Sequence, residues 1–382
     1  VAANQPGDAR YAAAPQVTQD VTFVFGNVLE FTSAPALEVY DLATVSAVES
    51  TGLPVSYEST TPSICSVDGQ TGSVDARSAG DCTIVARSGA ARATQTVTVT
   101  SPSAVTTPGT PAGVRATAGD ALGTVLVHVG ALRAGGSPVT AFTVSSSPAG
   151  LSATSATLPV AVTCPSSCAG YRFSAVATSA AGASAPSEPG NIVTLYQVVA
   201  TFREPDTQPN DSIFIGTYTL DASAGVVSGL RGKLSESMTG GPTAYPNDAM
   251  TWVPLQHQLS SVPATVDGAE GWLVATFRLD TTDTLARDPR YEGTDGWAPG
   301  SGMGLYFGYP GTNPGNAYVR IFVSAADPTA VPTQAQLAKL AYADCAPGGM
   351  MGASCMTGTS FTGYGTVGTM GGYPASQVTT KE

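Results

Sequence analysis

Two stretches of this 382-residue chain have closely similar sequences, and one of them lies at the start. Residues 17–23 read VTQDVTF and residues 93–99 read ATQTVTV, and each follows a Val-Ala pair and a Gly/Ala/Arg-rich turn. The second stretch closes a series of strand-like segments, whereas residues 1–23 have none before them. A lone pair of strands is marginally stable in water. We therefore expect residues 1–23 to form a β-hairpin that packs on a preceding domain, a neighbouring domain or another copy of the chain. The apolar side chains expected to make this contact are Val17, Val21 and Phe23.

The composition favours strands and turns over helices. Only 12% of the residues are charged, and 43 Gly and 28 Pro accompany many Thr, Ser, Val and Ala residues. This mixture suits short strands joined by tight turns. The net charge of −12 argues against nucleic acid and anionic membranes as partners, because both are bound through Lys and Arg. No apolar run reaches the length that spans a bilayer, so we expect no membrane insertion. These features predict an all-β chain of tandem sandwiches.

The six cysteines fall into three local pairs, a pattern typical of an oxidising compartment. The expected disulfides are Cys65–Cys82, Cys164–Cys168 and Cys345–Cys355. Zinc binding is the alternative, but the chain has only two histidines and no Cys-x-x-Cys pair. The chain begins at Val1 without an initiator Met or a signal peptide, which we interpret as a processed, mature species. We expect the protein to be secreted or displayed at the cell surface.

Residues 24–101 show the alternating runs and Gly/Pro turns of a β-sandwich. Three stretches carry a closer likeness: GLPVSYES at 52–59, TPSICSV at 61–67 and AGDCTIVA at 79–86. With these stretches the segment resembles the bacterial Ig-like repeats of large surface proteins, in which the paired cysteines tie two strands together. Residues 1–23 resemble the final hairpin of such a repeat. The resemblance implies an Ig-like sandwich on a bacterial cell surface.

A Pro/Thr-rich linker, residues 102–110, is expected to be extended. The next segment, 111–195, contains PAGVRATA at 111–118, GGSPVTAFTV at 135–144 and GYRFSAVATSAAG at 170–182. It resembles a fibronectin type III domain of bacterial secreted proteins, with Tyr171 in the place of that family's corner tyrosine. It departs from the family at Val127, where an aromatic residue is usual. The Cys164–Cys168 pair is expected to staple the turn before Tyr171.

Residues 196–382 hold all three Trp residues and most of the large aromatic residues. Strand-like runs at 196–202, 213–220, 271–277 and 317–323 predict a larger C-terminal β-sandwich of jelly-roll type. Part of it, 214–228, resembles a strand–turn–strand element of secreted bacterial β-sandwich proteins of unassigned family. One short helix is expected at 333–342, with Thr333 as its N-cap. A Gly/Met-rich disulfide tail follows.

The sequence contains no Gly-x-Ser-x-Gly, no P-loop and no His-Glu-x-x-His motif. Alternation along residues 125–129 places the valines inward and His128 outward. No nucleophile motif lies near His257, so a catalytic triad is not expected. Two carboxylates at a suitable separation would make a glycosidase pair, although exposed loop acids are the simpler interpretation. The candidates for such a pair are Glu236, Glu270, Glu292 and Asp295.

Two acidic clusters offer hard oxygen ligands for calcium, and no other cofactor is expected. Neither cluster has EF-hand spacing; their members are Asp206, Asn210 and Asp211, and Asp280, Asp283 and Asp288. Three aromatic residues of a turn-rich stretch, Trp297, Tyr306 and Tyr309, would stack on sugar rings. Core packing is the alternative for these rings.

Three functions fit this organisation. The first is structural: residues 1–23 of one copy complete a sandwich of the next copy, and the homopolymer forms an extracellular fibre, sheath or surface layer. The second is a cell-surface adhesin whose C-terminal sandwich binds polysaccharide. The third is an extracellular polysaccharide or polyester hydrolase with spacer domains, ranked last because no nucleophile motif is present.

Overall fold

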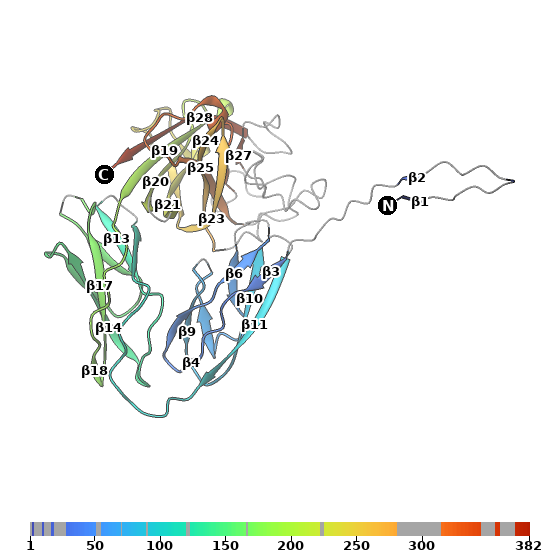
Figure 1. The fold of residues 1–382 in the computed structure, drawn as a ribbon. Helices are drawn as coiled ribbons and strands as arrows, with labels where there is room; N and C mark the ends of the chain where they lie inside the picture. The colour runs from blue at the N-terminus through green and yellow to red at the C-terminus, as the bar shows by residue number, and fades with distance from the viewer. Residues whose placement is uncertain are drawn as a thin grey trace.

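The computed structural model describes residues 2–3, 10, 17–18, 28–50, 55–69, 71–88, 91–119, 123–165, 167–221, 225–280, 315–344, 356–359 and 371–382. Most regular structure in these ranges is β-strand, with one α-helix, α1 (Gln334–Leu337), and two 3-10 turns. The predicted all-β fold class is confirmed. Three sandwiches follow one another along the chain in Figure 1.

The first sandwich is built from short strands between residues 29 and 100. One side consists of β4 (Leu37–Glu38), β11 (Ala91–Thr100), β10 (Gly80–Ser88) and β7 (Ser56–Ser59), in that order. The other side consists of β5 (Leu42–Thr44), β9 (Ser73–Ala76) and β8 (Cys65–Val67), with β3 (Leu29–Phe31) paired to β6 (Ala47–Glu49). A disulfide joins Cys65 on β8 to Cys82 on β10. Both cysteines are fully buried in the apolar core, so the bond ties the two sides of this sandwich together.

The second sandwich is built from residues 115–183. One sheet has the order β12 (Arg115–Ala118), β13 (Thr124–His128) and β16 (Val160–Thr163). The other has the order β15 (Ser152–Ser155), β14 (Val139–Ser147), β17 (Arg172–Ser179) and β18 (Gly182–Ala183). Along β13 and just after it, Val125, Val127 and Val129 are buried, as the alternation predicted. The Cys164–Cys168 disulfide precedes β17, where Tyr171 stacks on Phe173.

The third sandwich is one ten-stranded sheet that folds over on itself. Its strand order is β22 (Thr251–Leu255), β21 (Val226–Glu236), β20 (Ser212–Asp221), β19 (Leu195–Arg203), β28 (Gly371–Lys381), β27 (Met356–Thr359), β26 (Ala341–Asp344), β25 (Ala317–Ser324), β24 (Ala269–Phe277) and β23 (His257–Val266). The two halves enclose one apolar core. The Gln258 side chain of β23 accepts from the Leu230 amide and donates to the Val227 carbonyl, both on β21. The last strand in this order, β23, therefore contacts the second, β21.

The helix of this sandwich is shorter than the sequence suggested. Thr333 caps α1 with a complete capping box, as the sequence predicted for its start. The helix ends at Leu337 rather than continuing to residue 342, because Ala341 and Tyr342 begin β26 and pair with β25. Tertiary pairing here overrides the helical propensity of the alanine-rich run.

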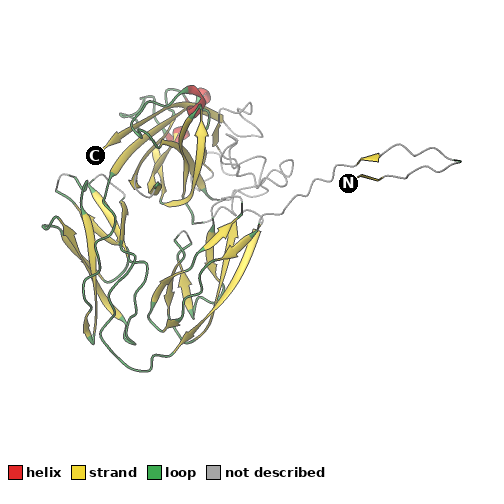
Figure 2. Cartoon of the chain, viewed as in Figure 1, coloured by secondary structure: helices red, strands yellow, loops and turns green. Residues whose placement is uncertain are grey.

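The first two strands of the chain form a separate sheet. Strands β1 (Ala2–Ala3) and β2 (Val17–Thr18) pair antiparallel, with Val17 opposite Ala3. Figures 1 and 2 show this N-terminal pair away from all three sandwiches. The other two predicted assembly residues, Val21 and Phe23, lie outside the described residues. In the described part of the chain, no helix is long and apolar enough to cross a membrane.

Candidate functional site

The first and second sandwiches are held together at Asp41, which is only 1% exposed. Its Oδ1 accepts from the Ala134 amide at 2.8 Å, and its Oδ2 accepts from Arg133 Nη1 at 2.6 Å. Leu42 and Leu132 exchange two backbone hydrogen bonds of 2.9 Å beside it. A buried carboxylate is tolerated when hydrogen bonds and charge satisfy it. The Asp41 contacts therefore fix the orientation of the two sandwiches.

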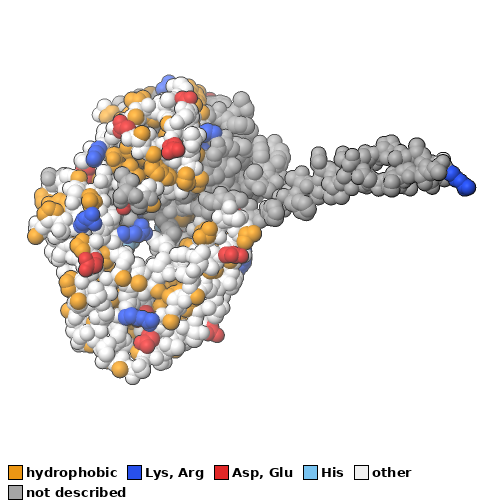
Figure 3. All heavy atoms as spheres, viewed as in Figure 1, with side chains coloured by type: hydrophobic (Ala, Val, Ile, Leu, Met, Phe, Trp, Pro, Cys, Tyr) orange, Lys and Arg blue, Asp and Glu red, His pale blue; other side chains and the backbone are white. Residues whose placement is uncertain are grey.

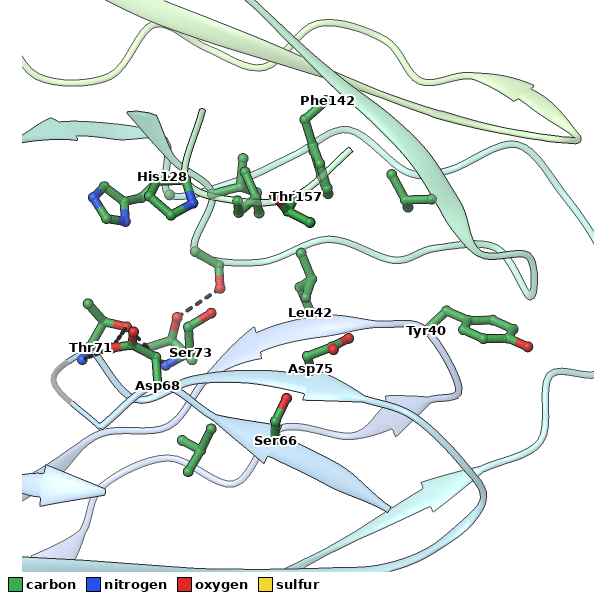
Figure 4. A pocket seen from close by; sticks show the side chains of 18 of the residues that line it. Tyr40, Leu42, Ser66, Asp68, Thr71, Ser73, Asp75, His128, Phe142 and Thr157 are labelled. Carbon is green, nitrogen blue, oxygen red and sulfur yellow. Dashed lines mark hydrogen bonds between the residues drawn. The ribbon is translucent and has the colours of Figure 1, made fainter. Parts of the chain in front are cut away.

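A cleft of about 820 Å³ opens between these two sandwiches. Figure 4 shows its two walls: Ser66, Ser73 and Asp75 line one wall, and His128 and Phe142 line the other. In Figure 3 the surface is hollowed between the two sandwiches, and few charged side chains appear on this face. The volume lies in the range of about 300–1,000 Å³ that is typical of ligand sites. The cleft is the best-formed candidate site in the described part of the chain.

The wall from the first sandwich is the outer face of the β5–β9–β8 sheet. Strand alternation sends Ala43, Val74 and Ala76 into the core. Their neighbours on the outer face are cross-strand partners of one another: Thr44 opposite Ser73, Leu42 opposite Asp75, and Ser66 opposite Asp75. Beside Leu42, this wall therefore carries three hydroxyl groups and one carboxylate, which we call the hydroxyl platform (Thr44, Ser66, Ser73 and Asp75). The Thr44 hydroxyl donates to the Gly130 carbonyl at 2.7 Å.

The wall from the second sandwich carries a histidine that is neutral at pH 7. Burial lowers the pKa of His128 to about 4, and the positive charges of Arg115 and Arg231 lower it too, against the opposing effect of Asp68. The His128 Nε2 lies 3.0 Å from the Thr117 hydroxyl. As predicted, the side chain faces away from its own core. It is half-buried nevertheless, because the other sandwiches lie beside it.

The second histidine of the chain, His257, shares two charged neighbours with His128. Burial lowers the pKa of His257 on β23, while Asp280 and Asp68 raise it and Arg231 lowers it. Asp68 and Arg231 thus act electrostatically on both His128 and His257. Each sandwich contributes to this charged junction, although its residues lie far apart in the sequence. No local sequence motif predicts a charged cluster whose members come from three sandwiches.

The first predicted calcium cluster serves as a hydrogen-bonded turn. The Asp211 carboxylate accepts from the Gln208 side chain at 2.7 Å and from the Glu204 amide at 3.1 Å. Asn210 is buried and donates to the Gly241 carbonyl at 2.8 Å, whereas Asp206 is exposed. No group of three or more His, Cys, Asp or Glu among the described residues is arranged to hold a metal. In the second cluster, Asp280 is exposed, and Asp283 and Asp288 lie outside the described residues.

Two of the four carboxylates proposed for glycoside hydrolysis are described. Glu236, at the end of β21, is 8% exposed and accepts a short hydrogen bond from the Thr251 hydroxyl. Glu270, at the start of β24, is exposed. Several other predicted residues fall outside the described ranges and stay predictions: Glu292, Asp295, Trp297, Tyr306, Tyr309 and the Cys345–Cys355 pair.

A buried acid that sequence reasoning missed lies in the third sandwich. Glu204 is 1% exposed, and burial raises its pKa to about 8, although hydrogen bonds with Tyr342 and Ser212 oppose the shift. Tyr342 donates to Glu204 and accepts from Ser212 at 3.2 Å. Gly372 passes so close to the carboxylate that a side chain there would collide with it. Tyr342 follows Glu204 by 138 residues, so no local pattern connects the two.

No family model matches the sequence, and no curated protein matches it. A crystal structure of titin domains is similar at 14% identity over 43% of this chain and 64% of that one, with a TM-score of 0.20. Human protocadherin-24 EC1-2 is similar at 14% identity over 41% and 93%, with a TM-score of 0.18. Domains 4–9 of the surface layer protein SbsC are similar at 14% identity over 66% and 44%, with a TM-score of 0.15. The chain spans less than two thirds of the titin and SbsC segments. TM-scores this low carry no argument, so the fold and the cleft rest on the contacts described above.

Proposed function

We propose that this protein is a subunit of an extracellular fibre, sheath or surface layer, joined by strand complementation through residues 1–23. The observation that carries the proposal is the N-terminal pair, a two-stranded sheet that stands apart from the three sandwiches. Two strands alone are marginally stable, so the pair gains stability by adding to another sheet. The sequence around its second strand, VTQDVTF at 17–23, is similar to ATQTVTV at 93–99 in β11. Strand β11 is already part of a larger sheet, in which it pairs with β10.

A groove along β11 supplies an acceptor for that strand. It has a volume of about 620 Å³ and is lined by residues 29–34 and 93–96. Strand β4 pairs only with the end of β11, at Val99 and Thr100, in the described residues. The groove lies beside the first half of β11, on the side of that strand away from β10. An added strand would gain backbone hydrogen bonds from such an edge. Contacts of this head-to-tail kind do not close, so they generate filaments.

Two further properties support an extracellular structural role. The Cys65–Cys82 and Cys164–Cys168 disulfides suit an oxidising compartment. The junction at Asp41 and the backbone bridge between Leu42 and Leu132 fix neighbouring sandwiches relative to each other. Fixed junctions suit a protein that transmits load or sets a lattice spacing.

The proposal is tested by comparing the full chain with a chain that lacks residues 1–23. Light scattering and electron microscopy of the full chain should show concentration-dependent filaments or sheets, and the truncated chain should remain monomeric. In a second variant, Thr96→Lys places a charge on the exposed side of β11 within the groove and should also reduce assembly. The matched control is Thr98→Lys, an exposed position of the same strand outside the groove lining. A full chain that stays monomeric at every concentration, or assembly that survives the truncation, would refute the proposal.

A further inference from the structure

We propose that the cleft between the first and second sandwiches binds a neutral oligosaccharide chain. In this arrangement a sugar ring stacks on Tyr40 at one end, and sugar hydroxyls bond to the hydroxyl platform along the wall. Nothing in this inference depends on self-assembly. It also places recognition in the cleft rather than at Trp297 of the third sandwich.

The backbone at Tyr40 is the first supporting observation. Tyr40 has a φ of 77°, a left-handed value that favours Gly and strains the backbone of other residues. It is the third residue of a turn closed by the bond from the Asp41 amide to the Glu38 carbonyl. Such a position usually holds Gly or Asn. An aromatic residue here is costly for the fold, and Tyr40 is 38% exposed and lines the cleft. Strain of this kind is characteristic of ligand-contacting positions.

The turn also sets the position of the ring. The next residue, Asp41, is the buried clamp between the sandwiches, and the Glu38 amide donates to it at 3.0 Å. Figure 4 shows Tyr40 at one end of the cleft and Asp68 with His128 at the other, with the hydroxyl platform between them. The clamp thus holds an aromatic ring and a polar wall in fixed relation before any ligand arrives. Preorganisation of this kind reduces the entropic cost of binding.

The chemistry of the platform matches the edges of sugars. Ser66, Ser73 and Asp75 are adjacent on one sheet face, with cross-strand neighbours about 5 Å apart. Hydroxyl groups both donate and accept, and a carboxylate accepts from two neighbouring hydroxyls. An aromatic ring adds a flat apolar surface for the sugar face at small entropic cost. This combination of one ring with a row of small polar groups recognises a polyhydroxylated ligand.

The charges favour a neutral ligand. On the cleft walls the negative charge of Asp68 interacts with the positive charge of Arg115. The Asp75 carboxylate lies 3.7 Å from Arg77 Nε, so neither positive nor negative charge dominates. The net charge of −12 repels polyanions in general. An extended peptide would need an open strand edge, but the cleft presents a sheet face, and β5 at its edge already bonds to Leu132. A neutral sugar chain fits the balanced charges of the walls, the negative net charge and the absence of an open strand edge among the described residues of the cleft.

The experiment is a binding screen of the full chain against linear gluco-, xylo- and manno-oligosaccharides, followed by calorimetry on any that bind. Binding in the micromolar to millimolar range is expected. Tyr40→Gly should weaken it at least tenfold, while the unfolding midpoint stays the same or rises because Gly accepts the left-handed backbone. Asp75→Asn keeps the shape of the platform and should weaken binding less. The matched control is Tyr373→Ala, which removes another exposed ring, from β28, and should leave binding unchanged.

The outcomes separate the alternatives. A silent screen overturns the inference, as does binding that survives both Tyr40→Gly and Asp75→Asn. Binding that is lost on Trp297→Ala but kept in Tyr40→Gly would place recognition in the third sandwich and also overturn it. Selective binding of peptides, with no sugar bound, would identify the cleft as a peptide site instead.

Discussion

The two junctions between the sandwiches are built on opposite principles. Between the first and second sandwiches, much of the attachment passes through one buried carboxylate, Asp41, beside an open cleft. Between the second and third sandwiches, one strand, β19, supplies residues to both apolar cores. Leu195 belongs to the core of the second sandwich, and the next residue, Tyr196, belongs to that of the third. The Thr217 hydroxyl also donates to the Gly119 carbonyl at 2.8 Å.

The difference indicates which joint a single substitution can open. A polar joint depends on a few directional contacts, and loss of one acceptor leaves several donors without a partner. A joint at which one strand enters two apolar cores spreads its energy over many small contacts. We therefore expect a substitution at Asp41 to loosen the first joint, whereas no single substitution should free the third sandwich from the second.

The largest effect is expected from Asp41→Ala. This variant removes the acceptor of the Arg133, Ala134 and Glu38 donors, and we expect a loss of about 3–4 kcal/mol in the free energy of unfolding. Small-angle scattering should show a wider spread of dimensions. The matched control at the other joint is Thr217→Val, which should cost about 1 kcal/mol without any change in dimensions. Equal effects of the two variants would remove the distinction between the joints.

A second, smaller effect concerns the acid inside the third sandwich. Because the pKa of Glu204 rises to about 8 on folding, the folded state holds a proton that the unfolded state releases above about pH 4.5. Stability should therefore fall as the pH rises from 4.5 to 8, by up to about 1.4 kcal/mol per pH unit. Denaturant midpoints across this window measure the slope. In Glu204→Gln the part of the slope due to this group should vanish, and an unchanged slope would contradict the assignment.

The smallest effect has the opposite sign and belongs to the cleft. The folded-state pKa of His128 is about 4, so between pH 6.5 and pH 4 the unfolded state binds a proton that the folded state does not. Stability should fall as the pH drops through this window, by up to about 1.4 kcal/mol per pH unit. Measuring stability against pH for His128→Gln and for the parent chain separates the contribution of His128 from the contributions of other titrating groups. If the two curves are parallel, His128 is not desolvated in the cleft.

Local signals in the sequence were sufficient for much of the fold. Alternation along β13 correctly placed Val125 and Val127 in the core, and Thr333 was correctly predicted as the N-cap of the helix. Both features depend on residues within a few positions of each other. The end of α1 was misjudged because Ala341 pairs with Thr359 and Arg320, which are distant in sequence.

The candidate site was much less predictable. His128 was correctly placed on the outer face of its strand, but its burial comes from contacts with other sandwiches. The role of Tyr40 depends on a left-handed backbone that a tyrosine in the sequence does not suggest. Glu204 directly follows β19, and nothing in that strand indicates that the acid is buried. Its hydrogen-bond donor, Tyr342, lies 138 residues further along the chain. Sites assembled from several sandwiches leave no pattern in any one segment.

The side chain of Gln258 stands in for a backbone ladder where β23, the last strand in the order of the ten-stranded sheet, approaches β21, the second. An amide group can release its two partners by rotating, without unzipping either strand. The third sandwich therefore has a seam, and thermal breathing of this body should begin along the line between β21 and β23.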